Sequence, residues 1–325
     1  MEANGKLEVI DYLRGFSIFT IVLMHLVQSF PLPDMMQKAT SLGGAGVHIF
    51  ILCSGFGLYL SHLRKPLNYG SFLKRRFVKV YIPYIIIVFI SALVPFFNTS
   101  PNKWSELLSH VFLYKMFSEE LECTFGGQLW FISTIIQFYL CWPLIVRFFQ
   151  QKNSLLYSIV ISLLWATFIY IIGISEKRIW NSFFLQYLWE FVLGMWLARK
   201  YFMTPEKIQI PDLKILFPVC IVSLGVFGVL ALSGGVFKLY NDIPSMVGYL
   251  TLSLLFYRLF PKFLTKFFIK TNAISYEWYL VHILVFGCCS HFMGNLSPWI
   301  IGTVSFGMSY IVAVIYAYLL RLNSR

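Results

Sequence analysis

Long apolar stretches alternate with short polar segments along the whole chain. Each stretch holds about 20 residues, the length that an α-helix needs to cross a bilayer core of about 30 Å. The pattern therefore predicts an all-α, polytopic integral membrane protein with about ten transmembrane helices. We place these helices at residues 12–30, 43–62, 77–97, 127–148, 154–174, 182–201, 214–233, 242–260, 273–291 and 297–320. No long linker or internal repeat divides the chain, so we expect a single transmembrane domain over residues 1–325.

The composition agrees with a membrane protein and argues against other classes. Hydrophobic residues make up 58% of the chain and charged residues 12%, whereas soluble domains average about 25% charged residues. The net charge of +12 would indicate nucleic-acid binding in a soluble protein. Here the positive-inside rule accounts for it, so we expect no nucleic-acid partner. The six cysteines show no CxxC spacing, and only Cys123 falls in a loop. We therefore expect no metal site and no disulfide framework.

Lysine and arginine are distributed unevenly between the two sides of this topology. With the N-terminus in the cytoplasm, 20 of the 26 lysines and arginines fall on the cytoplasmic side and 6 on the outer side. Positive charge is retained on the cytoplasmic side of membrane proteins. We therefore expect both termini in the cytoplasm.

The longest connection on the outer side covers residues 98–126. Apolar residues recur there at helical spacing, which predicts an amphipathic helix on the outer interface, formed by Trp104, Leu107, Leu108, Val111 and Phe112. Four glutamates gather in the same connection. A solvated rim and a lid over an acceptor site are the two interpretations of this segment.

The first apolar stretch carries ionisable residues, which are costly in a membrane span. Arg14 and His25 are eleven residues apart, close to three helical turns, so they share one helix face and lie roughly 16 Å apart along its axis. With Arg14 at the cytoplasmic interface, His25 would lie about halfway across the bilayer. A neutral imidazole can accept a proton and return it. His25 is therefore our catalytic candidate, and a packing hydrogen bond is the alternative. Asp11 lies one turn before Arg14 and can pair with it.

A second basic group stands between the second and third predicted spans. Arg75, Arg76 and Lys79 lie within one helical turn of each other. Guanidinium and ammonium groups in this arrangement suit the phosphates of a cytosolic ligand. Binding to anionic lipid head groups is the alternative, and the sequence leaves the two open.

Further polar residues interrupt the predicted spans. Glu190 is the one acid that we place deep in a span, so it must be protonated, paired or facing water. Ser54 belongs to a glycine-rich segment that permits close helix contact or backbone approach to a ligand. His48 has no assigned role. Polar stripes at helical spacing complete the set: Trp130, Thr134, Gln137 and Cys141 in one span, and Ser275, Tyr279 and His282 in another.

Five segments occur in the order found in a known family. They are DYLRGFSIFTIVLMH at 11–25, HIFILCSGFGL at 48–58, LKRRFVKVYIPY at 73–84, QLWFISTIIQFYLCWPL at 128–144 and ISYEWYLVH at 274–282. In these segments the chain resembles the acyltransferase-3 family, the bacterial membrane O-acyltransferases that modify polysaccharides and lipopolysaccharide. The R-x10-H pattern of Arg14 and His25 is the most specific part. Cys53 and Glu277 depart from the commoner family residues.

The resemblance implies roles for individual residues. His25 would be the catalytic histidine and Arg14 would be essential near the donor, with Asp11 and Glu190 as supporting residues. Arg75 and Arg76 would help to hold acyl-CoA, and Trp130 would line or brace the site. Our full set of cofactor-binding candidates adds Lys79 and Ser54 to these three residues. Tyr279 and His282 would also line or brace the site.

The resemblance also implies a reaction and a location. The donor would be cytosolic acyl-CoA, with acetyl-CoA the commonest in the family. The acceptor would be a hydroxyl of a cell-envelope glycan or exported sugar on the outer side. The protein would lie in the bacterial cytoplasmic membrane, in contact with the lipid bilayer. It would transfer the acyl group directly, without the outer hydrolase-like domain that some relatives carry. A homodimer stays open.

Two other classes of function compete with acyl transfer. A transporter or flippase for a glycan or lipid would use His25 and Glu190 as a proton relay. Such proteins commonly contain inverted repeats, and the sequence shows none. A structural membrane scaffold would give no reason for an ionisable group in the middle of a span. Binding of coenzyme A would distinguish an acyltransferase from a transporter.

Overall fold

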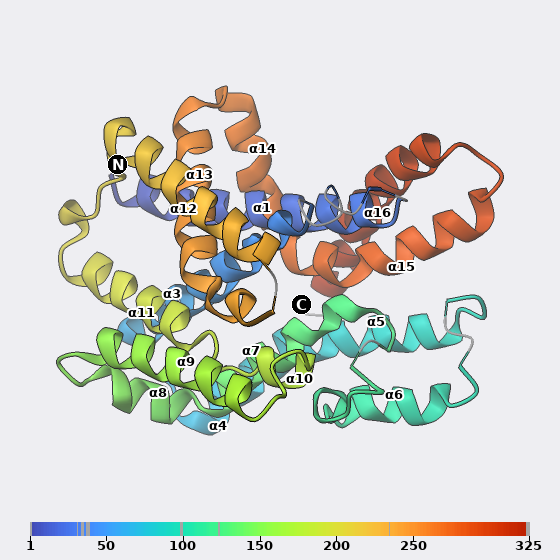
Figure 1. Cartoon of the computed structure of the whole chain (residues 1–325), viewed down its shortest axis with the longest axis horizontal. Coiled ribbons are helices and arrows are strands. Elements are labelled where there is room, and N and C mark those ends of the chain that lie inside the picture. Colours follow the sequence, from blue (N-terminus) through green and yellow to red (C-terminus); the bar gives the residue numbers. More distant parts are fainter. Residues whose placement is uncertain are drawn as a thin grey trace. The chain divides into compact units, whose positions relative to one another are not determined.

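Helices account for the secondary structure of this protein, as the computed structural model in Figure 1 shows. The structure describes residues 2–30, 32–33, 36, 40–97, 100–122, 124–233 and 235–322, and no strand occurs among them. The prediction of an all-α fold is therefore confirmed. Cys123, which we placed in a loop, lies outside the described residues.

The described residues form fifteen α-helices with the labels of Figure 1. They are α1 (Glu2–Gln28), α3 (Gly46–Arg64), α4 (Tyr69–Arg76), α5 (Ile82–Leu93), α6 (Lys103–Val111), α7 (Trp130–Leu140), α8 (Trp142–Phe149), α9 (Ser154–Ile171), α10 (Arg178–Asn181), α11 (Leu188–Met203), α12 (Leu213–Ser233), α13 (Asp242–Leu259), α14 (Lys262–Asn272), α15 (Ser275–Met293) and α16 (Pro298–Leu322). Short 3₁₀ helices precede α3 (η1, Ser41–Ala45) and α13 (η6, Gly235–Tyr240), and a π-helical turn over Phe77–Tyr81 joins α4 to α5.

Fewer helices than predicted are long and apolar enough to cross a membrane. Among the described residues there are six, or up to eight if two bent helix pairs each form one span. The six are Glu8–Gln28, Gly43–Arg64, Tyr69–Leu93, Ser154–Ile171, Leu213–Ser233 and Pro298–Leu322. A multi-pass membrane protein is supported, but the prediction of about ten spans is not confirmed.

Two of the predicted spans are shorter or more polar than expected. The stretch predicted as 182–201 forms α11, which begins only at Leu188 and has 16 residues. A span needs about 20 residues. The stretch predicted as 242–260 forms α13, which has Asp242 in its first turn and Arg258 in its last. Neither helix is a candidate span, because each has too little uninterrupted apolar length.

The chain divides into two compact units. Unit 1 comprises residues Met1–Pro66, Phe149–Ser175 and Leu185–Ser275, and unit 2 comprises Leu67–Phe148, Glu176–Phe184 and Tyr276–Arg325. The prediction of one domain over 1–325 is not tested by this division and stays a prediction.

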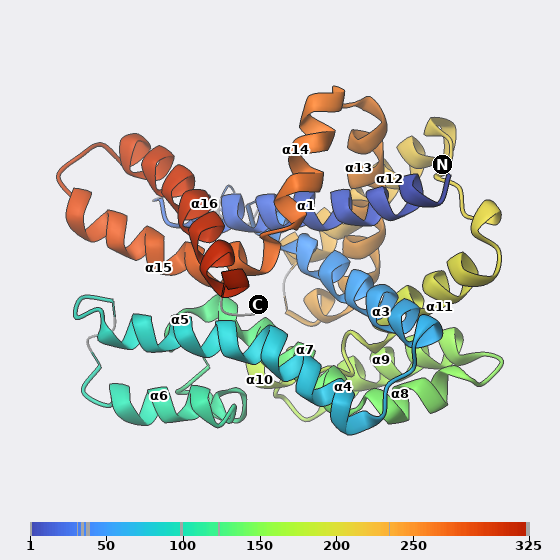
Figure 2. The same ribbon diagram turned by 180° about the vertical axis from the view of Figure 1, so that it is seen from behind.

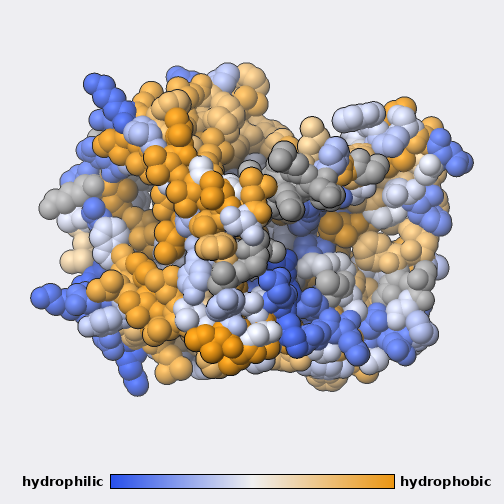
Figure 3. All heavy atoms as spheres, in the orientation of Figure 1, coloured by the Kyte–Doolittle hydropathy of each residue, from blue (hydrophilic) through white to orange (hydrophobic). Residues whose placement is uncertain are grey.

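Unit 1 is built around a core shared by α1, α3, α11, α12, α13 and α14. Its aromatic centre places Phe268 of α14 against Tyr12 and Phe16 of α1, with ring centroids 5.6 and 5.2 Å apart. Outside this core α12 carries large exposed apolar side chains, including Phe217, which is 60% exposed. Figure 3 shows these hydrophobic side chains gathered over α12 on the visible face. Such a surface suits contact with lipid.

Unit 2 contains α4–α8, α10, α15 and α16 and is held by hydrogen bonds that bridge distant segments. The Trp278 indole donates to Ser309 Oγ at 2.9 Å. Tyr276 donates to the Val80 carbonyl at 2.6 Å, and Tyr316 donates to the Pro83 carbonyl at 2.7 Å. Val80 lies in the π-helical turn, and Pro83 lies in the first turn of α5.

The predicted amphipathic helix of the outer connection forms as α6. It buries Leu107 (4% exposed) and exposes Trp104, Leu108 and Phe112. The helix is therefore confirmed. Its position at the outer interface and its role as a lid stay predictions.

Two glycines allow α3 and α11 to approach closely in unit 1, where the helices run side by side in both views (Figure 1 and Figure 2). A Cβ added at Gly55 would lie 2.1 Å from the Phe191 carbonyl oxygen, and one added at Gly194 would lie 2.0 Å from the Leu52 carbonyl oxygen. Both distances are far inside van der Waals contact with backbone. The two helices can therefore pack at this distance only without these side chains.

We expect Gly194→Ala to lower the free energy of unfolding of unit 1 by about 1–3 kcal/mol, because the added methyl must push two helix backbones apart. Thermal unfolding in detergent measures the change. Gly57→Ala on α3 is the matched control, since nothing lies within 4 Å of its Cβ position. Equal melting temperatures for the two variants would contradict the close packing.

Candidate functional site

Three sequence-predicted residues lie on α1 in unit 1. Asp11 accepts a hydrogen bond from the Asn272 side-chain amide at 2.7 Å and stays within electrostatic reach of Arg14. The Arg14 guanidinium lies over the Phe50 ring, 5.9 Å from its centroid. Asp11 is therefore tied to α14, and Arg14 faces α3.

His25 is half-buried and lies in the last turn of α1. The candidate span covers Glu8–Gln28, so His25 lies three residues before its end rather than at its centre. The helix begins earlier than the predicted residue 12, and the sequence Pro31-Leu32-Pro33 does not favour its continuation. The depth of His25 in a bilayer stays a prediction.

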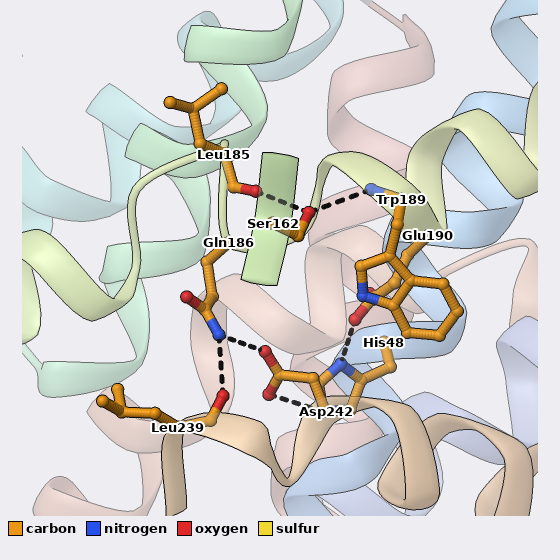
Figure 4. Close-up of polar contacts among 8 residues, drawn as sticks. All are labelled: His48, Ser162, Leu185, Gln186, Trp189, Glu190, Leu239 and Asp242. Atoms are coloured by element: carbon orange, nitrogen blue, oxygen red, sulfur yellow. Dashed lines mark hydrogen bonds and ion pairs between the residues drawn. The ribbon is translucent and has the colours of Figure 1, made fainter. Parts of the chain in front are cut away.

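A second histidine of unit 1 forms a buried polar cluster, drawn in Figure 4. His48 Nδ1 lies 2.7 Å from Glu190 Oε1, and Glu190 is fully buried. His48 Nε2 lies 3.9 Å from Asp242 Oδ1. The Gln186 amide nitrogen donates to Asp242 Oδ2 at 2.6 Å and to the Leu239 carbonyl at 3.1 Å. The prediction that Glu190 must be protonated, paired or facing water is met by pairing.

The cluster lies near the middle of the first span. A Cβ added at Gly46 would touch the Ser17 carbonyl at 3.0 Å, and Phe50 lies against Arg14. Because these contacts run in opposite order along α1 and α3, the helices are antiparallel, and His48 is level with the segment between Arg14 and Ser17. That level is roughly 13 Å along α1 from His25. The level of His48 is therefore closer to the middle of Glu8–Gln28 than His25 is.

Sequence analysis found one half of this cluster and missed the other. Glu190 stood out as a deep acid, but His48 was left without a role and Asp242 was read as the first residue of a span. Helical periodicity shows which residues share a face of one helix and does not show which helices pack together. The signal that could have indicated His48 was the rule that an acid deep in a span needs a partner. Among the described residues, no group of three or more His, Cys, Asp or Glu side chains is arranged to hold a metal ion.

In unit 2 the structure places Tyr279 beside His282 and beside the segment that leads into Trp130. Tyr279 donates a hydrogen bond to the Gln128 carbonyl, and its ring lies 5.7 Å from that of Phe131. The rings of Tyr279 and His282 are 6.2 Å apart, and His282 is fully buried. Tyr279 therefore braces the backbone that leads into Trp130.

Trp130 follows a strained backbone segment. Phe125 has φ 53° and Gly126 has φ 112°, both in the left-handed region. A Cβ at Gly126 would lie 2.4 Å from Gln128 Oε1. The Arg178 guanidinium stacks over the Trp130 ring at 4.8 Å. Strain of this kind concentrates at functional sites. The role of Trp130 at the donor stays a prediction.

The predicted phosphate-binding residues also lie in unit 2. Arg75 and Lys79 are exposed, at the end of α4 and in the π-helical turn. Arg76 lies over the Phe72 ring at 5.7 Å, and its buried Nε has no hydrogen-bond partner. Ser54, by contrast, is on α3 in unit 1 and donates to the Phe50 carbonyl of its own helix at 2.7 Å. Its role with the cofactor stays a prediction.

Sequence comparison assigns the chain to a family. A family model described as an acyltransferase domain matches residues 7–318. The chain belongs to this family. The predicted acyltransferase-3 membership is thereby confirmed, and the match includes all the motif residues placed above.

One relative of this chain is the acyltransferase MdmB of Streptomyces mycarofaciens. The two sequences are 26% identical over 158 residues, which cover 45% of this chain and 41% of MdmB. The chain therefore aligns with less than half of that relative. No solved structure matches the chain.

The connection that contains α6 buries a histidine of unit 2. His110 Nδ1 lies 2.6 Å from the Tyr84 hydroxyl, and its Nε2 lies 2.9 Å from Thr124 Oγ1. Burial, and then the nearby charge of Lys115, lower the pKa of His110 to about 2. The imidazole is therefore neutral at pH 7 and serves as a packing and hydrogen-bonding group of the loop.

We expect acid to loosen this loop. The pKa of His110 in the folded loop lies below its ordinary value of about 6.5, so the unfolded loop binds a proton that the folded loop rejects. Stability is unaffected above pH 6.5 and falls as the pH drops below it. Hydrogen exchange of residues 100–122, corrected for intrinsic rates, should rise between pH 7 and 5. His110→Gln should remove most of this dependence, whereas exposed His291→Gln should not. Equal pH sensitivity in wild type and His110→Gln would contradict this role.

Proposed function

We propose that this protein is a membrane-bound O-acyltransferase. It moves an acyl group, most simply acetyl, from cytosolic acyl-CoA to a hydroxyl of a cell-envelope glycan or exported sugar. The observation that supports this proposal best is the match of the acyltransferase family over residues 7–318, with Arg14 and His25 of the R-x10-H pattern on one helix. Multiple apolar helices support a place in a membrane, and the family resemblance favours the bacterial cytoplasmic membrane.

Two chemical routes fit the proposal. In the first, His25 takes the proton of the acceptor hydroxyl while its oxygen attacks the thioester carbon, the C–S bond breaks, and the proton passes to the leaving thiolate. In the second, a nitrogen of His25 attacks the thioester first and carries the acyl group until the acceptor oxygen displaces it. Both routes end with one ester and one free thiol, and neither consumes a proton. Arg14 would stand on the same helix near the donor.

Acyl-CoA supplies a phosphorylated nucleotide that needs cationic groups. Arg75 and Lys79 are exposed and available for its phosphates, and the half-buried Arg76 stands beside them in the sequence. Acetyl is the simplest acyl group for this role, and the acceptor is a hydroxyl on the outer side. With the cytoplasmic side set by the positive-inside rule, the donor enters from inside and both termini lie inside.

A proton-coupled transporter or flippase is the second candidate, because the buried His48–Glu190 pair is also what a proton relay would use. The relay that we predicted joined His25 to Glu190, whereas the structure pairs Glu190 with His48. A transporter would have no reason to bind coenzyme A. Thermal stabilisation by acetyl-CoA therefore favours the acyltransferase.

We expect His25→Ala to abolish acyl transfer in folded protein, since it removes the base or acyl carrier, while stabilisation by acetyl-CoA persists. Mass spectrometry of envelope glycans measures the loss of the acyl increment. His291→Ala replaces an exposed histidine outside the family motifs and serves as control. Transfer at near wild-type rate in His25→Ala would reject His25 as the reacting group.

We expect the double variant Arg75→Gln/Arg76→Gln to lose most of the stabilisation by acetyl-CoA in nanodiscs, because two phosphate-binding cations are removed. The matched control is Lys262→Gln/Lys266→Gln, which removes two exposed cations of α14. If the arginine variant keeps its acetyl-CoA shift but loses stabilisation by phosphatidylglycerol, the cluster binds lipid head groups instead.

A further inference from the structure

The amphipathic helix α6 runs beside α5 in unit 2, as both views show (Figure 1 and Figure 2). Two hydrogen bonds fix which residues of the two helices are level with each other. Tyr81 donates to the Val111 carbonyl at 2.6 Å, and the Tyr84 hydroxyl lies 2.6 Å from His110 Nδ1. The last turn of α6 is therefore level with the junction of the π-helical turn and α5.

This level lies at the middle of a candidate membrane span. The span covers Tyr69–Leu93, and Tyr81 is equally far from its two ends. From Tyr81 to Leu93, which the charge distribution places on the outer side, the helix rises about 18 Å. The nine residues of α6 form a helix about 13 Å long, which fits alongside this outer half. The helix α6 is therefore oriented along the span and not across its end.

The start of α7 reaches the same level from the other direction. Tyr276 of α15 donates to the Val80 carbonyl at 2.6 Å, and Tyr279, one turn further along, donates to the Gln128 carbonyl. The two acceptor carbonyls are therefore about one helical turn apart in level, roughly 5 Å. The helix α7 begins two residues after Gln128, at Trp130.

The helix α7 accompanies only the other half of the span. At its far end the Tyr69 hydroxyl donates to the Leu140 carbonyl at 2.7 Å, so Leu140 is level with the first residue of Tyr69–Leu93. Its eleven residues form a helix about 16 Å long. The two helices α6 and α7 therefore lie beside different halves of one span, α6 from Tyr81 outward and α7 from Tyr81 inward.

The backbone between these two helices is irregular at the middle level. Between 112 and 129, the described residues form only short 3₁₀ turns, and Leu113, Phe125 and Gly126 have positive φ. The contact of His110 Nε2 with Thr124 Oγ1 at 2.9 Å holds the returning chain at the level of the last turn of α6. Irregular backbone at membrane depth is tolerated only where it is buried in protein or lines a water-filled cavity.

The exposed side of α6 is apolar over its whole length. Trp104, Leu108 and Phe112 recur every fourth residue, and each is at least half exposed. The neighbouring α5 exposes Ile82 and Phe89 in the same half of the span. Contiguous exposed apolar side chains mark contact with a membrane or a partner. Because α5 belongs to a candidate span, the acyl chains of lipids are the partner that fits.

A different part of unit 2 exposes charge near the start of α7. Lys177 Nζ lies 2.7 Å from Glu119 Oε1, with the side chains 41% and 53% exposed. Arg178, which follows Lys177, lies over the Trp130 ring at 4.8 Å, so the ion pair is close to the first turn of α7. Charged side chains at membrane depth pair with each other or face a water-filled cavity. The exposed surface of this pair therefore has to meet water.

We propose that residues 100–129 form a re-entrant segment, which enters the membrane from the outer side and turns at its middle. Leu108 and Phe112 of α6 contact the acyl chains of lipids. The turn that follows α6 faces water that enters from the outer side. A polar solute outside the cell thereby gains a path to the middle of the membrane within unit 2. This orientation replaces the expected one, in which α6 lies in the plane of the outer interface.

Spin labels test the orientation of α6. A nitroxide on a genetically encoded keto amino acid leaves the natural cysteines in place, and it replaces Trp104, Leu108 or Phe112, one at a time, in full-length protein in nanodiscs. Electron paramagnetic resonance then compares collisions with oxygen and with a polar nickel chelate, which report depth. We expect depth to increase in steps of about 6 Å from Trp104 to Phe112. The Phe112 label should be as deep as a reference label at Ile82 and deeper than one at Leu93.

A label at Glu120, which is exposed, tests the turn. We expect it to collide with the nickel chelate at least about tenfold more often than the Phe112 label, because hydrocarbon excludes a polar solute. Equal depths of the three α6 labels overturn the proposal, since α6 then lies in the interface. Exclusion of the chelate from Glu120 also overturns it, since protein then seals the turn.

Each labelled variant is compared only if it keeps the wild-type melting temperature. If the Phe112 variant does not fold, the Trp104 and Leu108 labels still decide the orientation, because a difference of about 6 Å between them is expected and equal depths reject it. The measurement contains no acetyl-CoA. Its outcome is therefore independent of the proposed acyl transfer, which the His25→Ala comparison tests separately.

Discussion

The pairing of His48 with Glu190 is the constraint on which unit 1 depends most. An ionisable carboxyl group in an apolar helical core is tolerated only when a partner takes over the role of water. Glu190 has no exposed surface and one oxygen 2.7 Å from His48. That distance requires α3 and α11 to stand close together, and the glycines at the crossing, Gly55 and Gly194, supply the room. Helix packing and the polar cluster therefore depend on the same two helices.

Local sequence features predicted what depends on one helix at a time. The all-α class follows from apolar stretches, and the placement of Arg14 and His25 on one helix follows from their spacing. The amphipathic helix α6 follows from the positions of Leu107 and Trp104. Each of these patterns is local, and each helix in question forms in the structure. Family membership could also be inferred, because the motif residues occur in a fixed order.

Features that depend on packing could not be predicted in the same way. The prediction of about ten spans is not confirmed, because α11 begins only at Leu188 and α13 carries Asp242 and Arg258 in its end turns. Hydropathy does not show where a helix begins inside an apolar stretch. His48 was overlooked because its partner lies 142 positions away. His25 was expected at the centre of its span, and the helix proved to begin earlier and end soon after it. The order of the family motifs along the sequence also did not show that the motifs would be divided between the two compact units.

The close contact of α3 and α11 at these glycines also limits which helices can move around the small cavity that Gln186 and Asp242 line. Backbone lies close to backbone at Gly55 and Gly194, so a side chain at either position would push the two helices apart. The opposite walls are different: Leu163 belongs to α9, and Tyr240 ends the short helix η6. A motion that widens this cavity would therefore move α9 and η6. The contact of α3 with α11 keeps His48 beside Glu190.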